Sequence, residues 1–236
     1  MNSETHGKAR AGESGNVFII IMIGVVLFAA LMITFSRSTR QGGENMNMKR
    51  AELAATDILS YMQKVERAVS RVQLKNVSES DLSFESALNA GYVNPSCTAA
   101  ACRIFNSAGG NMDFMVVDTS WLAQLESGQP EFGQWVFTGA NRVAGPAGAE
   151  LGTAAADLLM ILPWVDHNVC VALNKHLGVG APGAAPPQDT VDMNFTHYTG
   201  NFAPAPEEIL STAVPAACMS SQAKGGHHLY YTLVPR

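Results

Sequence analysis

The stretch GNVFIIIMIGVVLFAALMITFSRSTRQ, Gly15–Gln41, decides how the fold of this chain is interpreted. Its apolar part, residues 17–35, contains no charged residue. At about 1.5 Å of rise per residue it would form a helix roughly 28 Å long, close to a bilayer hydrocarbon core about 30 Å thick. A cleaved secretory signal would have a shorter apolar part and a small-residue cleavage site, which the segment MITFSRSTR does not supply. We therefore predict a retained transmembrane helix over residues 16–40, with the lipid bilayer as its partner.

The charges are distributed unevenly along the 236 residues. Residues 44–75 carry six Lys or Arg against four Asp or Glu, whereas residues 76–236 carry five against fourteen. The hydrophobic fraction, 47%, suits one membrane segment and one globular domain. An acidic domain repels phosphate backbones, so we exclude nucleic acid as a partner of this domain.

Four cysteines, Cys97, Cys102, Cys170 and Cys218, all follow the apolar stretch. Their even number is compatible with two disulfides in an oxidising compartment, and four reduced, partly buried thiols are the alternative. A Cys97–Cys102 bridge would close a short loop, and a Cys170–Cys218 bridge a far longer one. Of the three possible pairings we favour this one.

The flanking charges and the cysteines predict opposite orientations. Lys8 and Arg10 precede the apolar stretch, but more positive charges follow it, at Arg37, Arg40, Lys49 and Arg50. A positive-inside count would therefore keep the long C-terminal part in the cytoplasm. Long domains translocate largely regardless of charge, so we give the cysteines more weight and predict that residues 76–236 lie on the oxidising side.

A second helical pattern follows the apolar stretch. The segment QGGEN, Gln41–Asn45, predicts a hinge or a helix break because of its adjacent glycines. Apolar residues then recur every three or four positions, at Ala51, Ala54, Ile58, Met62, Val65, Val69 and Val72. This spacing predicts an amphipathic helix within residues 41–75. Its apolar stripe either packs on its own domain, which we favour, or contacts a partner subunit or a membrane surface.

Short elements are expected from residue 76 onward. The segments QWVFTGANRV (134–143), DMNFTHYTGNF (192–202) and HHLYYTLVPR (227–236) favour strands. The run DLLMILPWV (157–165) is either a buried strand or a short helix. The segment 163–178 predicts a helix with Asp166 as its cap and Gly178 as its end. The predicted fold class is α+β: an N-terminal transmembrane helix, extended by the amphipathic helix, packs on a small antiparallel sheet.

The sequence offers no convincing catalytic site. The segment SQAK, Ser221–Lys224, fits the S-x-x-K pattern of penicillin-recognising enzymes, but no S-D-N or K-T-G companion exists. No phosphate-binding glycine motif is present, so a nucleotide cofactor has no support. We predict neither catalytic nor cofactor-binding residues, and a membrane-anchored hydrolase is the least favoured class.

Metal binding is also not expected. His167 and Cys170, which follow Asp166, supply at most two ligands from one helix face, and nothing completes a tetrahedral set. His227 and His228 precede a predicted strand, where alternation sends them to opposite faces.

The N-terminus resembles that of type IV pilin and type II secretion pseudopilin precursors. The resemblance is carried by a short leader with Lys8 and Arg10, by Gly15 directly before the apolar run, and by a helix that continues beyond it. In that family a membrane peptidase cuts after the glycine and the new N-terminus packs into a helical filament. The resemblance implies processing between Gly15 and Asn16.

Beyond the leader, three segments are similar to poorly characterised alphaproteobacterial membrane proteins grouped loosely with type II secretion proteins. These are GNVFIII, Gly15–Ile21, FTGAN, Phe137–Asn141, and the final YYTLVPR. The chain departs from pilins at Ile20, the fifth position of the mature chain, where pilins usually carry a glutamate that meets the neighbouring subunit's terminal amine. Asn16 likewise replaces the usual aromatic residue or Met.

These features together predict a polar leader (1–15), a transmembrane helix (16–40), an amphipathic helix (41–75) and a periplasmic α+β domain (76–236). The resemblance implies a pilin-like or pseudopilin-like subunit of the bacterial inner membrane. Its partners would be other subunits, an assembly platform and a prepilin peptidase. Because Ile20 cannot pair with an amine, we expect a minor or initiating role in a type II secretion or type IV pilus-type assembly. The alternative is a membrane-tethered periplasmic binding or structural module that forms no filament.

Overall fold

The computed structural model describes residues 14–145, 150–189, 193–210 and 213–236. Within the long N-terminal helix, the side chains of residues 14–18 and 33–45 lie outside this description. The predicted leader, with Lys8 and Arg10, falls almost wholly outside it. The chain divides into two units, Met1–Asn47 and Met48–Arg236, and each is described by itself.

Helix α1, Ser14–Gln73, is continuous through the segment Gln41–Asn45. The predicted helix break at QGGEN is therefore wrong, whereas a hinge there stays a prediction. A glycine inside a helix costs only about 1 kcal/mol relative to alanine, and helical residues on both sides can offset that cost. Adjacent glycines weaken a helix without ending it.

The prediction of a transmembrane helix over residues 16–40 is also wrong. Among the described residues, no helix combines the length and the hydropathy needed to cross a bilayer. The described apolar side chains of α1 extend from Ile19 to Met32. The predicted inner-membrane localisation with a periplasmic domain was inferred from that helix. This prediction is therefore wrong as well.

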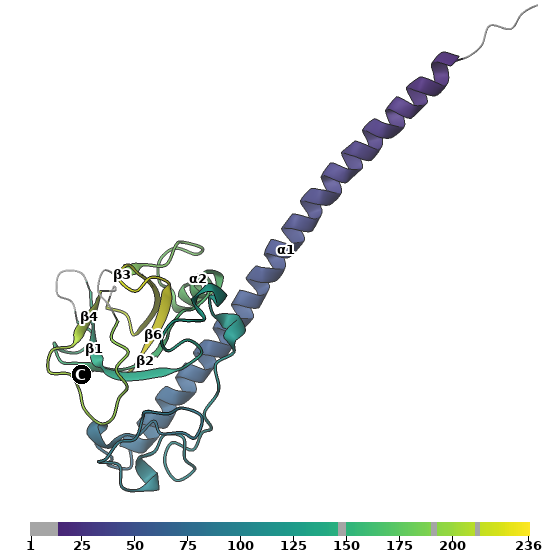
Figure 1. Ribbon diagram of the computed structural model, residues 1–236. Coiled ribbons are helices and arrows are strands. Elements are labelled where there is room, and N and C mark those ends of the chain that lie inside the picture. Colours follow the sequence, from purple (N-terminus) through teal and green to yellow (C-terminus); the bar gives the residue numbers. More distant parts are fainter. Residues whose placement is uncertain (1–13, 146–149, 190–192, 211–212) are drawn as a thin grey trace, which may run out of the picture. The chain divides into compact units, whose positions relative to one another are not determined.

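The second unit is built around one six-stranded sheet in the order β3-β5-β6-β2-β1-β4 (Figure 1). The strands are β1 (Val136–Ala144), β2 (Asp157–Leu162), β3 (Gln188–Asp189), β4 (Glu207–Leu210), β5 (Ala216–Ser221) and β6 (His227–Val234). The short 3-10 helices η1 (Glu79–Asp81), η2 (Ala100–Cys102), η3 (Thr119–Trp121) and η4 (Gln124–Glu126) precede them.

The sheet is mixed and not antiparallel as predicted. β1 pairs parallel with β4, and β3 pairs parallel with β5, whereas the pairs β1–β2, β2–β6 and β5–β6 are antiparallel. Parallel neighbours need long crossover connections, which leave no turn signature in the sequence. The parallel pairing of the two edge strands, β3 and β4, was therefore not predicted from the sequence.

The predicted strand at residues 192–202 is a loop over its described part, 193–202. The backbone of this loop makes isolated hydrogen bonds to β1. Tyr198 N donates to Phe137 O at 2.8 Å, and Ala203 N, just after the segment, donates to Gly139 O at 2.9 Å. A Cβ at Gly139 would lie 2.9 Å from a ring carbon of Phe202, so glycine permits this close approach. The FTGAN segment is thus a docking point for the loop.

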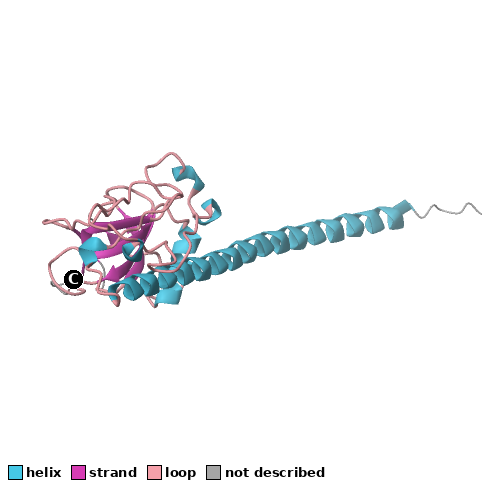
Figure 2. Cartoon of the chain, turned by 90° about the horizontal axis from the view of Figure 1, so that it is seen from below, coloured by secondary structure: helices cyan, strands magenta, loops and turns pink. Residues whose placement is uncertain are grey.

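The apolar stripe of α1 packs on its own domain, which is the favoured of the two sequence alternatives. Among the residues of α1 whose side chains are described, ten are buried: Ala51, Ala54, Ala55, Ile58, Tyr61, Met62, Val65, Ala68, Val69 and Val72. They share one hydrophobic cluster with one face of the sheet, including Phe137, Met160 and Leu229. Figure 2 shows this part of α1 lying along the strands.

β2 is buried on both faces, which explains why its sequence pattern was ambiguous. Leu158, Met160 and Leu162 belong to the cluster that contains α1, whereas Leu159 and Ile161 belong to a second cluster. A strand with apolar partners on both faces shows no alternation. The run DLLMIL is therefore a strand and not a helix.

Helix α2, His167–Leu177, begins and ends as predicted. The Asp166 carboxylate accepts a hydrogen bond from Asn168 N at 2.9 Å. Gly178 adopts a left-handed conformation, with φ 69°, which favours glycine at this position. Val169, Cys170 and Leu173 face the core.

Both disulfides have the pairing that the sequence favoured. Cys97 is joined to Cys102, five residues away, and Cys170 to Cys218, 48 residues away. The second bridge links α2 to β5 inside the core cluster, where both cysteines are fully buried. It closes the larger loop and so restricts the unfolded chain more.

We predict that the two disulfides contribute unequally to stability. Replacing Cys170 and Cys218 by Ala should lower the free energy of unfolding by roughly 4 kcal/mol, against roughly 2 kcal/mol for Cys97 and Cys102, because the entropy of loop closure grows with loop length. Urea unfolding of the two double variants, each compared with the wild type, measures the difference. An equal loss in both variants would contradict the argument.

Candidate functional site

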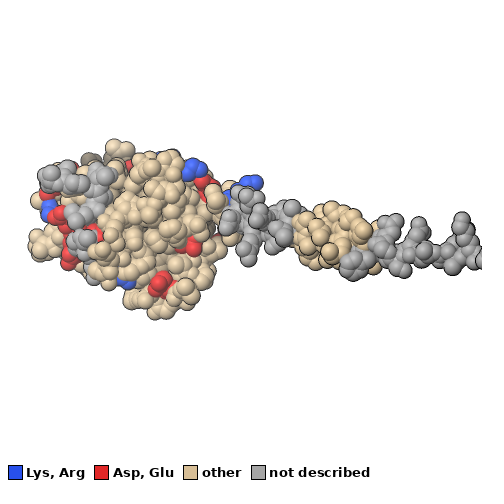
Figure 3. Space-filling view, turned by 90° about the horizontal axis from the view of Figure 1, so that it is seen from above, with Lys and Arg blue, Asp and Glu red and all other residues tan. Residues whose placement is uncertain are grey.

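The most unusual surface in the described chain is the apolar segment of α1 between Ile19 and Met32. Every described side chain in it is exposed; Ile20, Val25 and Phe28 are each 63% exposed. The described part of the segment shows no Lys, Arg, Asp or Glu in the space-filling view (Figure 3). A helix that is apolar on all sides is normally buried by something. This segment therefore has the character of a contact surface.

Exposed apolar residues elsewhere are mostly isolated. Leu125, in η4, is 99% exposed, and Leu88 and Val93 lie in loops. Single exposed apolar side chains are normal on protein surfaces. Only the α1 segment is a continuous apolar surface among the described residues.

A pocket of about 420 Å³ lies between α1 and α2 within the second unit. Its polar wall includes Glu52, which accepts a hydrogen bond from Lys175 at 2.5 Å and lies 2.8 Å from His176 Nε2. The hydrogen bond from Lys175 lowers the pKa of Glu52, with His176 acting in the same direction. The ion pair between Glu52 and Lys175 joins α1 to α2. Because both side chains are partly exposed to solvent, it contributes little to stability. His167 lines the same pocket.

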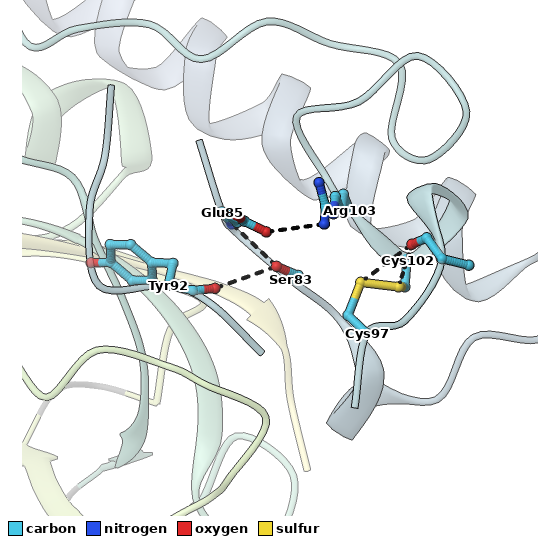
Figure 4. Close-up of polar contacts among 7 residues, drawn as sticks. Ser83, Glu85, Tyr92, Cys97, Cys102 and Arg103 are labelled. Carbon is cyan, nitrogen blue, oxygen red and sulfur yellow. Dashed lines mark hydrogen bonds and ion pairs between the residues drawn. A yellow bond between two sulfur atoms is a disulfide. The ribbon is translucent and has the colours of Figure 1, made fainter. Parts of the chain in front are cut away.

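A second hollow, of about 380 Å³, lies beside the Cys97–Cys102 loop. Figure 4 shows the polar contacts next to it: Arg103 lies 3.4 Å from Glu85, and Ser83 Oγ donates to Tyr92 O at 3.3 Å. Arg103 and Glu85 both line the hollow and pair with each other, and Asp113 lines it as well. The lining therefore holds one more acidic side chain than basic ones.

Ser221 and Lys224 do not form a catalytic pair. Ser221 Oγ accepts a hydrogen bond from the backbone N–H of Lys224 at 3.1 Å, which is a turn contact. The Lys224 ammonium lies 5.1 Å from the centre of the Phe195 ring. A cation over an aromatic ring is a stabilising contact in itself. The S-x-x-K pattern therefore marks a turn between β5 and β6.

The other suggested chemical groups have structural roles. Cys170 is in a disulfide, so it supplies no thiolate. Asp166 caps α2. Within the described residues, no group of three or more His, Cys, Asp or Glu side chains is arranged to hold a metal ion.

His227 and His228 face different environments, as alternation in a strand requires. His228 is fully buried: its Nδ1 accepts a hydrogen bond from Trp164 N at 3.2 Å, and its Nε2 lies 3.1 Å from Gly225 O. Burial is the main cause that lowers the pKa of His228 to about 4, so the ring is neutral at pH 7. His227 is half-buried and instead meets His167.

The contact between His167 and His227 was missed by the sequence reasoning. Their ring nitrogens Nδ1 and Nε2 lie 3.2 Å apart although the residues are 60 positions apart in the chain. The two residues begin α2 and β6, so only the folded arrangement brings them together. No local pattern could have indicated this pair.

The proposed processing residues lie at the start of α1. Gly15 and Asn16 are helical, and their side chains are outside the described set. Cleavage between them stays a prediction. Ile20 is described, and its apolar side chain is open to solvent.

The chain matches no protein-family profile, no curated protein and no solved structure. The pilin resemblance therefore rests on the residues quoted above.

We predict that His228 makes the fold acid-sensitive. The pKa of this ring is about 4 in the folded chain and 6.5 ordinarily, so the unfolded chain binds more protons between these values. Stability should be highest above pH 6.5 and fall by up to about 3 kcal/mol as the pH drops to 4.

The H228N variant is the matched control, because its side-chain oxygen can still accept from Trp164 N but does not titrate. Urea unfolding from pH 7.5 to 4 should show a steeper loss for the wild type than for H228N. Parallel stability curves would show that His228 is not responsible.

Proposed function

We propose that this chain is a pilin-like structural subunit that associates with other subunits through residues 19–32 of α1. The supporting observation is the contrast within one helix. From residue 51 to 72 ten apolar residues are buried on one face, with Leu53 exposed, whereas from 19 to 32 every described side chain is exposed. A continuous apolar surface of this kind indicates a binding surface for another molecule.

The partner we propose is the same segment of another subunit. The segment has no charged residue and no polar side chain, so its partner must bury apolar area without supplying ion pairs. An identical helix meets this requirement. Each large apolar side chain that becomes fully buried contributes about 1.5–3 kcal/mol, so a contact of a few helical turns would suffice for association.

Ile20 supports a minor or initiating role in such an assembly. The resemblance places a pairing carboxylate at this position in pilins, and here an exposed isoleucine occupies it. Without that carboxylate, the helix cannot form an ion pair with the terminal amine of a neighbouring subunit. Its position along the neighbouring helix is then not fixed by a charged contact. Recovery of the chain as the main component of sheared filaments would contradict this role.

The second unit supports a structural role more than an enzymatic one. Cys170 is in a disulfide, Asp166 caps a helix, and the Lys224 side chain lies over an aromatic ring. The runner-up function is a binding module that uses the pocket between α1 and α2 and does not assemble. The experiment below separates the two.

We predict that the V25D variant weakens self-association at least tenfold, because a buried unpaired carboxylate would cost several kcal/mol at the contact. The matched control is L125D, which places the same charge at a fully exposed position of the second unit. Sedimentation velocity of the full chain over a range of concentrations, in a mild detergent, measures association.

The proposal requires that the wild type and L125D associate alike and that V25D does not. A wild type that stays monomeric at all concentrations would favour the binding module. Equal association of all three proteins would place the contact elsewhere.

A further inference from the structure

His167 and His227 lie at the edge of the pocket between α1 and α2, and nothing in the proposed assembly uses them. His167 is the first residue of α2 and lines the pocket, and His227 is the first residue of β6. Nδ1 of one ring and Nε2 of the other are 3.2 Å apart, and the ring centres are 5.0 Å apart. His167 is exposed and His227 half-buried, so the nitrogens can be reached from solvent.

These two distances are compatible with two rings that converge on one point in front of their nitrogens. In a linear N–H···N hydrogen bond of this length, the ring centres would lie farther apart than 5.0 Å, because each ring would extend directly away from the other. The direction of each ring is taken as the line from its centre through the nitrogen. If these two lines meet symmetrically, standard imidazole dimensions place their meeting point about 2 Å in front of each nitrogen. Zinc–imidazole bonds have this length, about 2.0–2.1 Å.

The angle also fits. Two nitrogens 3.2 Å apart that each lie about 2 Å from one point subtend roughly 100° there, close to the tetrahedral angle that zinc adopts. Neutral imidazole is a preferred ligand of zinc, copper and nickel ions. We propose that His167 and His227 together form a two-histidine site for a divalent transition metal ion, with Zn²⁺ as the reference ion.

The surrounding charges have opposing effects on a bound cation. The positive N-terminus of α2 opposes the ion, but it is capped by the Asp166 carboxylate, which also interacts electrostatically with His227. Burial and then His167 lower the pKa of His227, whereas Asp166 raises it. Lys224 is directed to Phe195 and the adjacent His228 is turned into the core.

The site would be open, with two protein ligands and water at the other positions. Among the described residues, no third His, Cys, Asp or Glu joins the pair. The neighbouring pocket of about 420 Å³ has room for these waters or for a ligand brought by a partner. The Cys170–Cys218 disulfide already attaches α2 to the sheet, so the fold does not need the ion. We therefore expect reversible binding and little effect on the folded structure.

Titration calorimetry of the full chain with Zn²⁺, after treatment with a chelator, tests the site. We expect one ion per chain, with binding at least tenfold weaker in each of the variants H167Q and H227Q. The matched control is H176Q, because His176 is on the same helix but pairs with Glu52.

A second measurement does not depend on any variant folding correctly. The electron paramagnetic resonance spectrum of the wild type with one equivalent of Cu²⁺ should show coupling to two imidazole nitrogens. Absence of Zn²⁺ binding, equal binding by H167Q and the wild type, or Cu²⁺ coupled to fewer than two nitrogens would each overturn the inference. None of these outcomes bears on association through α1, because the two surfaces share no residue.

Discussion

The packing of α1 against the sheet is the contact on which the folded unit depends. Ten residues of the helix between Ala51 and Val72 are buried, and they cover one face of the central strands β1, β2 and β6. Without the helix, that face would be exposed as an apolar surface. The second cluster, on the other face, is closed by residues from loops and neighbouring strands such as Val179 and Met193. β2, buried on both sides, joins the two clusters into one domain.

The need to bury apolar side chains also distinguishes the two parts of α1. Where polar residues alternate with apolar ones at helical spacing, one flat surface is enough to bury the apolar stripe, and the sheet provides it. Between Ile19 and Met32 the apolar residues surround the helix, so no single surface could bury them all. Several helices packed together can do so. Such packing is the assembly that we propose for this segment.

Local patterns predicted the local features of this chain well. The amphipathic stripe of α1, the Asp166 cap and the Gly178 end of α2 all depend on residues close in sequence, and all are present. The disulfide pairing was also favoured correctly, because loop length distinguished the bridges. Apart from this pairing, the features that depend on distant residues were mostly missed or wrong.

The errors have physical causes. The segment 193–202 has strand-like residues, but it makes only isolated backbone hydrogen bonds to β1 and so remains a loop. The edge strands β3 and β4 gain their partners through long connections. The glycines at residues 42 and 43 do not interrupt α1. The apolar run was interpreted as a membrane span from its length and its lack of charged residues, but no described helix is long and apolar enough to cross a membrane. The contact between His167 and His227 exists only once α2 and β6 are packed together.

The central claim is that residues 19–32 of one chain contact the same residues of another. The most direct measurement replaces Phe28 by a photoreactive benzoylphenylalanine in a mixture of ordinary and nitrogen-15-labelled full-length chains. Illumination followed by mass spectrometry identifies the cross-linked peptides and shows whether they come from different chains. The account predicts mixed-isotope cross-links within residues 19–32. Cross-links confined to a single chain, or directed only to residues 48–236, would contradict it.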